Sequence, residues 1–164
     1  MRRQHGFTMV ELILVIVLVG VLAAVGIPRL MGEDFTKAVV FGDQVASTLR
    51  QAQKTAVARR RLVCVETTAT TLRLRIRTSP ARPLATDGAA ACNAALAGVT
   101  DGDRDSADAK VTMTNAPATL FFHPDGTIGS TPLGAPFGAR TIEIRMDEQT
   151  RRNIVFDGRT GYVE

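Results

Sequence analysis

The 164-residue sequence has few of the residue types on which metal centres and small disulfide-built folds depend. It has no tryptophan and one tyrosine, and its two histidines, His5 and His123, are too few for a multi-histidine metal centre. Two cysteines exclude a four-cysteine zinc site and a miniprotein held by several disulfides. Neither a Gly-x-Ser-x-Gly nucleophile elbow nor a Gly-x-x-x-x-Gly-Lys phosphate loop occurs. We therefore predict no enzyme, no metal and no cofactor, and we interpret His123 as a surface turn residue.

The apolar residues, 45% of the chain, are concentrated in one block near the start. Leu12–Ile27 is sixteen residues long without a charge, and the run extends back to Phe7 with only Thr8 and Glu11 as interruptions. As a helix, residues 7–27 would be about 31 Å long, close to the ~30 Å hydrocarbon core of a bilayer. The basic residues Arg2 and Arg3 precede it, which places that end in the cytoplasm and the rest of the chain outside.

Three interpretations of this block compete. A buried core helix is disfavoured because the run is apolar on every face. A secretory signal peptide, removed around Ala23–Ala24, fits the basic start, but the run exceeds the usual ~7–15 apolar residues. We favour a retained membrane helix. Glu11 would then either lie at the headgroup level, where water solvates it, or meet a cation supplied by another chain, because an unpaired carboxylate in lipid is costly.

The residues Gly6-Phe7-Thr8-Met9-Val10-Glu11, between a basic leader and an apolar helix, resemble the prepilin processing site of type IV pilins and type II secretion pseudopilins. The resemblance implies that a prepilin peptidase cleaves after Gly6 and methylates the new amine of Phe7. It also implies that Glu11 is the acidic residue that neutralises the amine of a neighbouring subunit during filament assembly. Leaving either charge unpaired in the helical core is expensive, so this pairing would set the axial register.

The expected organisation is therefore a leader at 1–6, a transmembrane and filament-core helix at 7–27, and a periplasmic part at 28–164. Gly20 and Pro28 are predicted weak points of the helix, because glycine lowers helix stability and proline removes a backbone hydrogen bond. Pro28 corresponds to the helix-loosening proline of the family. The alternative is the ordinary tolerance of glycine and proline in membrane helices.

Beyond Pro28, apolar residues from Phe35 to Val57 recur at steps of three and four, so we extend the helix to about Ala58, with a local break near Gly32. Strict alternation in 72–77 predicts a strand whose leucines and isoleucine point inward and whose three arginines point outward. A hairpin at 67–71 is predicted to pair this strand with another at 62–65. Residues 78–110 are predicted to form a long loop. Further strands are expected at 118–122, 141–146 and 153–156.

The predicted fold class is α+β: a long amino-terminal α-helix, half membrane-embedded and half amphipathic, packed on a carboxy-terminal antiparallel β-sheet. Segments 50–58, 122–126 and 156–163 resemble the GspH/FimT branch of minor pseudopilins, and through it the type IV pilin-like fold. Within that branch, the cysteine-bearing strand and the Thr-Gly-Tyr-Val ending most resemble MshC-type proteins of mannose-sensitive haemagglutinin pili.

Cys64 and Cys92 are the only thiols, and both are predicted to lie outside the cytoplasm, where a disulfide is favoured. The bond would close a loop of about 28 residues and stabilise the fold by about 3–4 kcal/mol in the chain-entropy model. The alternative is two independent small apolar residues. A redox-active pair would more naturally be a Cys-x-x-Cys motif.

Residues 50–82 include nine basic residues and one acidic residue, whereas residues 87–108 include five aspartates and one arginine. The basic block could hold phosphates of DNA or carboxylates of neighbouring subunits, or it could be a solvated face. No aromatic residues are interleaved for base stacking, which disfavours DNA. The residues of this predicted face are Arg59, Arg60, Arg61, Arg73, Arg75 and Arg77.

The resemblance and the residues together predict a minor pilin or pseudopilin that initiates or joins a type IV pilus-like filament or a type II secretion pseudopilus. The alternative is a minor pilin that captures DNA for uptake. The expected partners are prepilin peptidase, other pilins or pseudopilins, an inner-membrane assembly platform and membrane lipid. The expected location is the bacterial inner membrane, with the amino terminus cytoplasmic, and later the filament.

Overall fold

The computed structural model describes residues 8–96 and 104–164, and for residues 25 and 27–34 it describes the backbone alone. The chain divides into two compact units, Met1–Thr36 and Lys37–Glu164. The first contains the start of the long helix. The second, called the head below, contains the rest of that helix and the described strands.

Helix α1 extends over Met9–Arg59, close to the predicted limits of Phe7 and Ala58. It begins at Thr8, whose side-chain oxygen accepts a hydrogen bond from the backbone N–H of Glu11 at 3.3 Å. Thr8 and Glu11 are thus spaced as the first and last residues of a capping box, a signal that the sequence analysis missed. The backbone is helical through Gly20, Pro28 and Gly32, so the break expected near Gly32 is not present.

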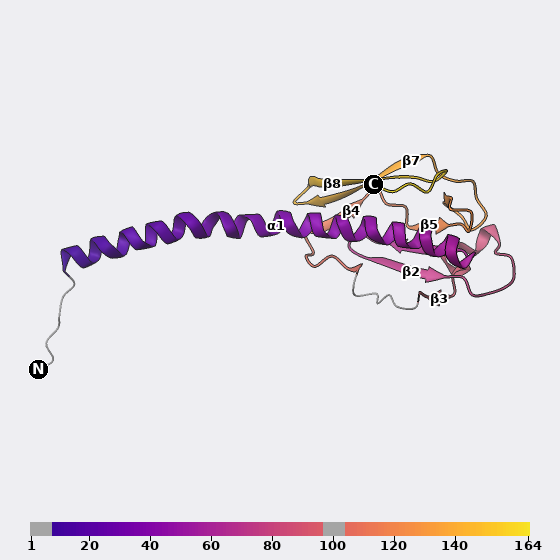
Figure 1. Ribbon diagram of the computed structural model, residues 1–164, viewed down its shortest axis with the longest axis horizontal. Coiled ribbons are helices and arrows are strands. Elements are labelled where there is room, and N and C mark those ends of the chain that lie inside the picture. Colours follow the sequence, from indigo (N-terminus) through magenta and orange to yellow (C-terminus); the bar gives the residue numbers. More distant parts are fainter. Residues whose placement is uncertain (1–7, 97–103) are drawn as a thin grey trace, which may run out of the picture. The chain divides into compact units, whose positions relative to one another are not determined.

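In the described residues of the head, the strands form two antiparallel sheets (Figure 1). The five-stranded sheet has the order β3-β2-β1-β5-β6, and the three-stranded sheet has the order β4-β7-β8. The strand bounds are β1 Val63–Thr67, β2 Leu72–Ile76, β3 Ala94–Ala95, β4 Val111–Thr114, β5 Thr119–Phe122, β6 Ile128–Gly129, β7 Ala139–Met146 and β8 Gln149–Asp157. The predicted α+β class is confirmed, as is the hairpin that pairs β1 with β2.

The prediction of an unstructured loop at 78–110 was wrong in part. This segment contains the 3-10 helix η1, Ala85–Ala91, and the two-residue strand β3. Strands β4 and β6 were also missed. In β4, buried Val111 and Met113 alternate with threonines, so the strand signal was present but short. By contrast β3 and β6 have two residues each, and they exist because a neighbouring strand offers an edge to pair with.

The main core lies between α1 and the inner faces of the two sheets. Helix residues such as Phe41, Val45 and Leu49 are almost fully buried there, as are the inward residues of β2 and of β7 and β8. Phe35 and Val57, predicted to lie on the same apolar stripe, are instead 53% and 46% exposed.

The end of the chain and the turn after β5 both accept hydrogen bonds from side chains of α1. Arg50 Nε donates to the carbonyl oxygen of Val163 at 3.0 Å, and Gln53 Nε2 donates to that of Gly126 at 3.3 Å. Gly161 has a φ of 71°, and a β-carbon there would lie within 2.2 Å of the Gly126 carbonyl oxygen. Only glycine therefore lets the closing turn approach the helix so closely.

Candidate functional site

The predicted processing site lies outside the described residues, because Gly6 and Phe7 are not among them. The adjoining part of α1 is described. Glu11 lies in the first helical turn, where a carboxylate interacts favourably with the positive end of the helix dipole. Thr8 caps the backbone N–H of Glu11, so the contribution of this cap to the helix end must be separated from any role of the Glu11 charge in assembly.

The described large apolar side chains at the start of α1 are mostly exposed. The large apolar residues from Met9 to Leu22 are between 45% and 81% exposed. Nothing lies within 4 Å of the β-carbon position of Gly20, so this glycine makes no close packing contact. In the part of the chain that the structure describes, no helix meets the length and apolarity that a membrane crossing needs. The predicted single-pass topology is therefore not confirmed.

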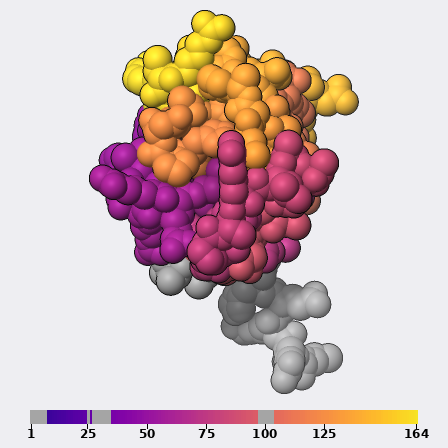
Figure 2. Space-filling model, turned by 90° about the vertical axis from the view of Figure 1, so that its right-hand side faces the viewer, coloured from indigo at the N-terminus to yellow at the C-terminus, as the bar shows by residue number. Residues whose placement is uncertain are grey.

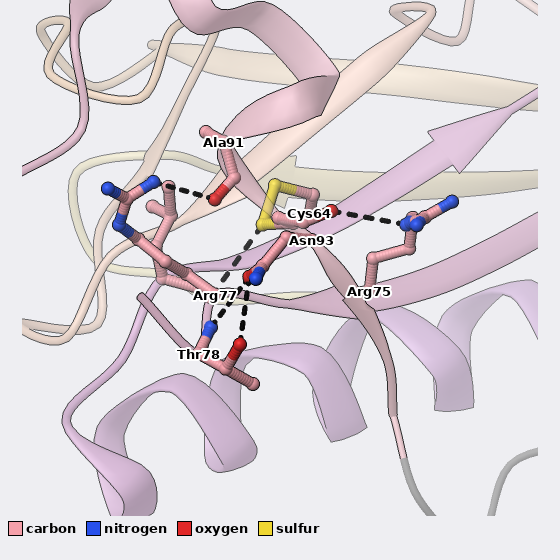
Figure 3. Close-up of a disulfide and its surroundings, with 8 residues drawn as sticks. Cys64, Arg75, Arg77, Thr78, Ala91 and Asn93 are labelled. Carbon is pink, nitrogen blue, oxygen red and sulfur yellow. Dashed lines mark hydrogen bonds between the residues drawn. A yellow bond between two sulfur atoms is a disulfide. The ribbon is translucent and has the colours of Figure 1, made fainter. Parts of the chain in front are cut away.

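The predicted disulfide between Cys64 and Cys92 is present, with the two Cα atoms 6.0 Å apart. Both residues are buried, in a small second cluster with Leu62, Ala91 and Phe121. This cluster lies on the face of the five-stranded sheet opposite α1, because Cys64 and Phe121 alternate with residues of the main core along β1 and β5. The bond attaches the end of η1 to the centre of that outer face (Figure 3).

Two of the three arginines predicted to point outward in 72–77 hold the covering segment in place. Arg75 Nε donates to the carbonyl oxygen of Cys92 at 3.1 Å, and Arg77 Nη1 donates to that of Ala91 at 2.8 Å (Figure 3). Arg77 also donates to the carbonyl oxygen of Ala81 at 2.6 and 3.1 Å. The side-chain oxygen of Asn93 accepts hydrogen bonds from the backbone and hydroxyl of Thr78. These arginines therefore bind the covering segment through its backbone carbonyl oxygens.

The predicted basic face is consequently divided. Arg73 is exposed and lies opposite Glu66 in the β1–β2 register, toward the other end of the strand from Arg77. Arg77 instead joins the three arginines that end α1. Arg61 Nη1 donates to the carbonyl oxygen of Thr78 at 2.8 Å, which brings the end of α1 to the end of β2.

A hollow of about 520 Å³, called the arginine pocket below, lies where these segments meet. Figure 2 views the head from this end, where the last residues of α1, the segment after β2 and the loops after β5 come together. The sequence analysis did not assign Arg82 or His123 to this site. The charged and titratable residues that line it are Arg59, Arg60, Arg61, Arg77, Arg82 and His123.

His123 starts the predicted turn, since its carbonyl oxygen accepts a hydrogen bond from the backbone N–H of Gly126 at 2.9 Å, and its side chain is half-buried. Burial lowers the pKa of the imidazole below its usual 6.5, and the nearby carboxylate of Asp125 opposes this shift. Among the described residues, His123 Nε2 is buried without a hydrogen-bond partner. Hydrogen bonds from the backbone and hydroxyl of Thr127 lower the pKa of Asp125.

The acidic segment is anchored elsewhere on the helix. Asp108 lies 3.2 Å from Lys37 Nζ, and its pKa is lowered first by the backbone N–H of Lys110 and then by Lys37. The buried guanidinium of Arg104 donates to Thr48 and Gln51 of α1. Neither Asp108 nor Asp105 lines the arginine pocket. In the described residues, no group of three or more His, Cys, Asp or Glu side chains is arranged to hold a metal ion.

Two family models match the chain. The prokaryotic N-terminal methylation motif matches residues 1–27, and type II transport protein GspH matches residues 42–160. A solved structure, the type IV minor pilin FimU of Pseudomonas aeruginosa, is similar with a TM-score of 0.52 and 19% sequence identity. The similarity covers 82% of this chain and 88% of FimU, and at this identity it shows the fold alone. No curated protein matches the chain significantly.

These matches confirm the predicted GspH/FimT branch and the pilin-like fold. The resemblance to MshC-type proteins is not tested by them and stays a prediction.

Proposed function

Since the chain belongs to the GspH family of type II transport proteins, we propose that it is a minor subunit that initiates or joins a type IV pilus-like filament or a type II secretion pseudopilus. The family and the fold are those of pilins and pseudopilins, which are structural subunits and not enzymes. The methylation motif at 1–27 implies processing by prepilin peptidase. The proposed cleavage is after Gly6, with methylation of the amine of Phe7.

The observation that carries the proposal is the exposed apolar start of α1. A helix whose large side chains are 45–81% exposed from Met9 to Leu22 needs an apolar environment, because so large an apolar surface is unfavourable in water. Lipid would supply this environment before assembly, and the helices of neighbouring subunits would supply it in a filament. We therefore propose that residues 7–27 first anchor the chain in the inner membrane, with the head periplasmic, and then enter the filament core.

Glu11 is the one acidic residue in the apolar segment from Phe7 to Ile27. In the proposed assembly step, its carboxylate binds the methylated amine of the adjacent subunit's Phe7. Both charges would otherwise be unpaired in an apolar environment, so this pairing favours a single axial register over sliding. The proposed partners are therefore prepilin peptidase, other filament subunits and the inner-membrane assembly platform.

The capping box allows the charge of Glu11 to be separated from its contribution to the helix. Glutamine serves at the last position of a capping box as well as glutamate does, so Glu11→Gln removes the charge and preserves the cap. Thr8→Ala removes the capping oxygen and preserves the charge. In a host that carries the filament system and prepilin peptidase, both variants should be inserted and cleaved, and intact mass should show a chain that starts at N-methylated Phe7.

We expect Glu11→Gln to lower the amount of subunit in sheared filaments by at least about tenfold. The reason is that the amine of the adjacent subunit would stay buried without a carboxylate partner, which costs more than about 1.4 kcal/mol. Thr8→Ala should stay within about twofold of the parent, because an exposed cap contributes only about 1 kcal/mol to the helix. Equal incorporation of Glu11→Gln and the parent would show that the charge of Glu11 is not needed for assembly. A mature chain beginning after Ala23 or Ala24 would overturn the proposed processing.

Capture of DNA is the alternative function. Its support is the basic block between residues 50 and 82. Because Arg75 and Arg77 bind backbone carbonyls and Arg73 lies apart from the arginine pocket, the six predicted arginines do not act as one continuous face for a duplex. DNA is therefore treated below as a competing ligand of the arginine pocket.

A further inference from the structure

The carboxy-terminal cap of α1 has an unusual residue in its left-handed position. The backbone N–H of Arg61 donates to the carbonyl oxygen of Ala56 at 3.1 Å, and that of Arg60 donates to Val57 at 3.3 Å. This pair of hydrogen bonds is a Schellman motif, and Arg60 occupies its left-handed position with a φ of 50°. Glycine usually fills that position, because an L-residue there is strained by its β-carbon.

An arginine in the left-handed position is unfavourable for the backbone, so Arg60 departs from the preference for glycine at this position. Such departures concentrate at functional sites, where the side chain is needed despite the strain. The side chain of Arg60 lines the arginine pocket together with the two arginines that flank it. The unusual cap and the basic hollow are therefore two independent observations on the same residue.

Among the described residues, acidic side chains do not neutralise the positive charge of the pocket. In the part of the chain that the structure describes, none of its five arginines forms an ion pair, whereas Lys37 and Arg152 each pair with an aspartate. Arg61 and Arg77 are already oriented by hydrogen bonds to backbone carbonyls. Arg59, Arg60 and Arg82 are exposed beside them. Five arginines at one hollow repel one another unless an anion binds.

The walls of the pocket are apolar between the arginines. Four prolines and two leucines contribute to the lining, and one of them, Leu133, is 44% exposed. The apolar lining residues are Pro80, Pro83, Pro124, Pro132, Leu62, Leu133 and the small Ala81. A ligand that matches this surface presents carboxylates next to apolar side chains, because guanidinium groups bind carboxylates through paired hydrogen bonds and prolines offer a rigid apolar surface.

We propose that the arginine pocket docks an acidic, apolar-flanked polypeptide segment of a neighbouring filament subunit. The identity of the partner rests on the filament function proposed above, whereas the binding itself does not. A peptide is favoured over a duplex because the arginines line a hollow of about 520 Å³ and not an open ridge. Apart from the half-buried imidazole of His123, the pocket also lacks aromatic residues on which bases stack.

The test uses the processed full-length chain in detergent and a fluorescent hexapeptide of alternating glutamate and leucine. A glutamine–leucine hexapeptide controls for apolar binding, and a labelled duplex of about 20 base pairs represents DNA. Arg60→Gly removes the guanidinium and at the same time relieves the left-handed strain. Arg73→Gln removes one arginine of the same basic block that lies away from the pocket, so it is the matched control for general charge.

We expect the glutamate peptide to bind at least about tenfold more tightly than the glutamine peptide. Arg60→Gly should weaken binding about five- to tenfold while its thermal midpoint stays equal to that of the parent or rises. Arg73→Gln should change the affinity by less than about twofold, and the duplex should bind more weakly than the peptide.

Three results would overturn the proposal. Equal binding of the two peptides would exclude carboxylate recognition, and equal losses in Arg60→Gly and Arg73→Gln would indicate diffuse charge without a site. Preference for the duplex, lost in Arg60→Gly, would assign the pocket to nucleic acid. Failure of any kind in this assay leaves the Glu11 experiment unaffected, so the docking proposal and the filament function can fail separately.

Discussion

The two faces of the five-stranded sheet are built by different means. The face toward α1 is covered by a helix whose apolar residues interlock with those of β1, β2 and β5 in a core of fully buried side chains. The opposite face has a cluster of five buried residues, and its cover is a loop and a short 3-10 helix. That cover is attached by a disulfide and by arginine side chains that bind its carbonyl oxygens.

The difference has a physical cause. A long amphipathic helix buries enough apolar surface to remain on a sheet without a covalent link, since each buried large side chain contributes about 1.5–3 kcal/mol. The segment from Thr78 to Asn93 contains five alanines and two prolines and buries little apolar surface, so it needs a covalent bond and specific polar contacts. The inner face is stabilised mainly by the hydrophobic effect, whereas the outer face depends on one disulfide and on specific hydrogen bonds.

Adjacent phenylalanines on β5 give the sharpest comparison of the two faces. Phe122 is fully buried in the main core, and Phe121 is buried in the outer cluster. We expect Phe122→Ala to destabilise the head by about 3–5 kcal/mol in denaturant unfolding, because a cavity remains in a rigid core. Phe121→Ala should cost about 1.5–3 kcal/mol, since the residue also lines an open hollow of about 810 Å³ that water can enter. Equal losses would contradict the distinction between the faces.

Removal of the disulfide should loosen the outer face more than the rest of the head. We expect Cys64→Ala with Cys92→Ala to lower the free energy of unfolding by about 3–4 kcal/mol, because the bond closes a loop over a separation of 28 residues. Hydrogen exchange should become fast in 78–93 through local opening, whereas β7 and β8 should accelerate only as far as the loss of global stability requires. In this background Phe121→Ala should cost less than in the parent, because its cover is already released. Equal exchange rates in 78–93 and in β7 and β8 would show that the outer face does not open separately.

The smallest expected effect concerns His123, at the arginine pocket. Because its pKa is lowered in the folded head, the unfolded chain binds a proton more readily below pH 6.5. The stability contribution of the neutral imidazole is therefore fully present above pH 6.5 and is lost as the pH falls through the lower folded-state pKa. His123→Gln should unfold at a midpoint that varies less between about pH 5 and pH 7 than that of the parent. An unchanged pH dependence would show that another group controls it.

Much of the head was predictable because its periodic segments are long or strictly alternating. Helix α1 was placed to within two residues at either end, and the inward residues Leu72, Leu74 and Ile76 of β2 are all buried as expected. The cysteine pairing followed from the count of thiols and the predicted compartment. By contrast η1, β3 and β6 have no periodic signal, because they form only where tertiary contacts bring them to a sheet.

The sequence by itself determined which residues of β2 turn toward the core and which turn away, because side chains alternate between the faces of a strand. It also determined that α1 ends in three consecutive arginines. Only the tertiary structure decided what the outward arginines contact. Arg75 and Arg77 bind a segment that returns over the outer face, and Arg77 joins the end of α1 while Arg73 does not. That outcome depends on where a chain segment without periodicity closes over the sheet, and local alternation does not specify such a long-range contact.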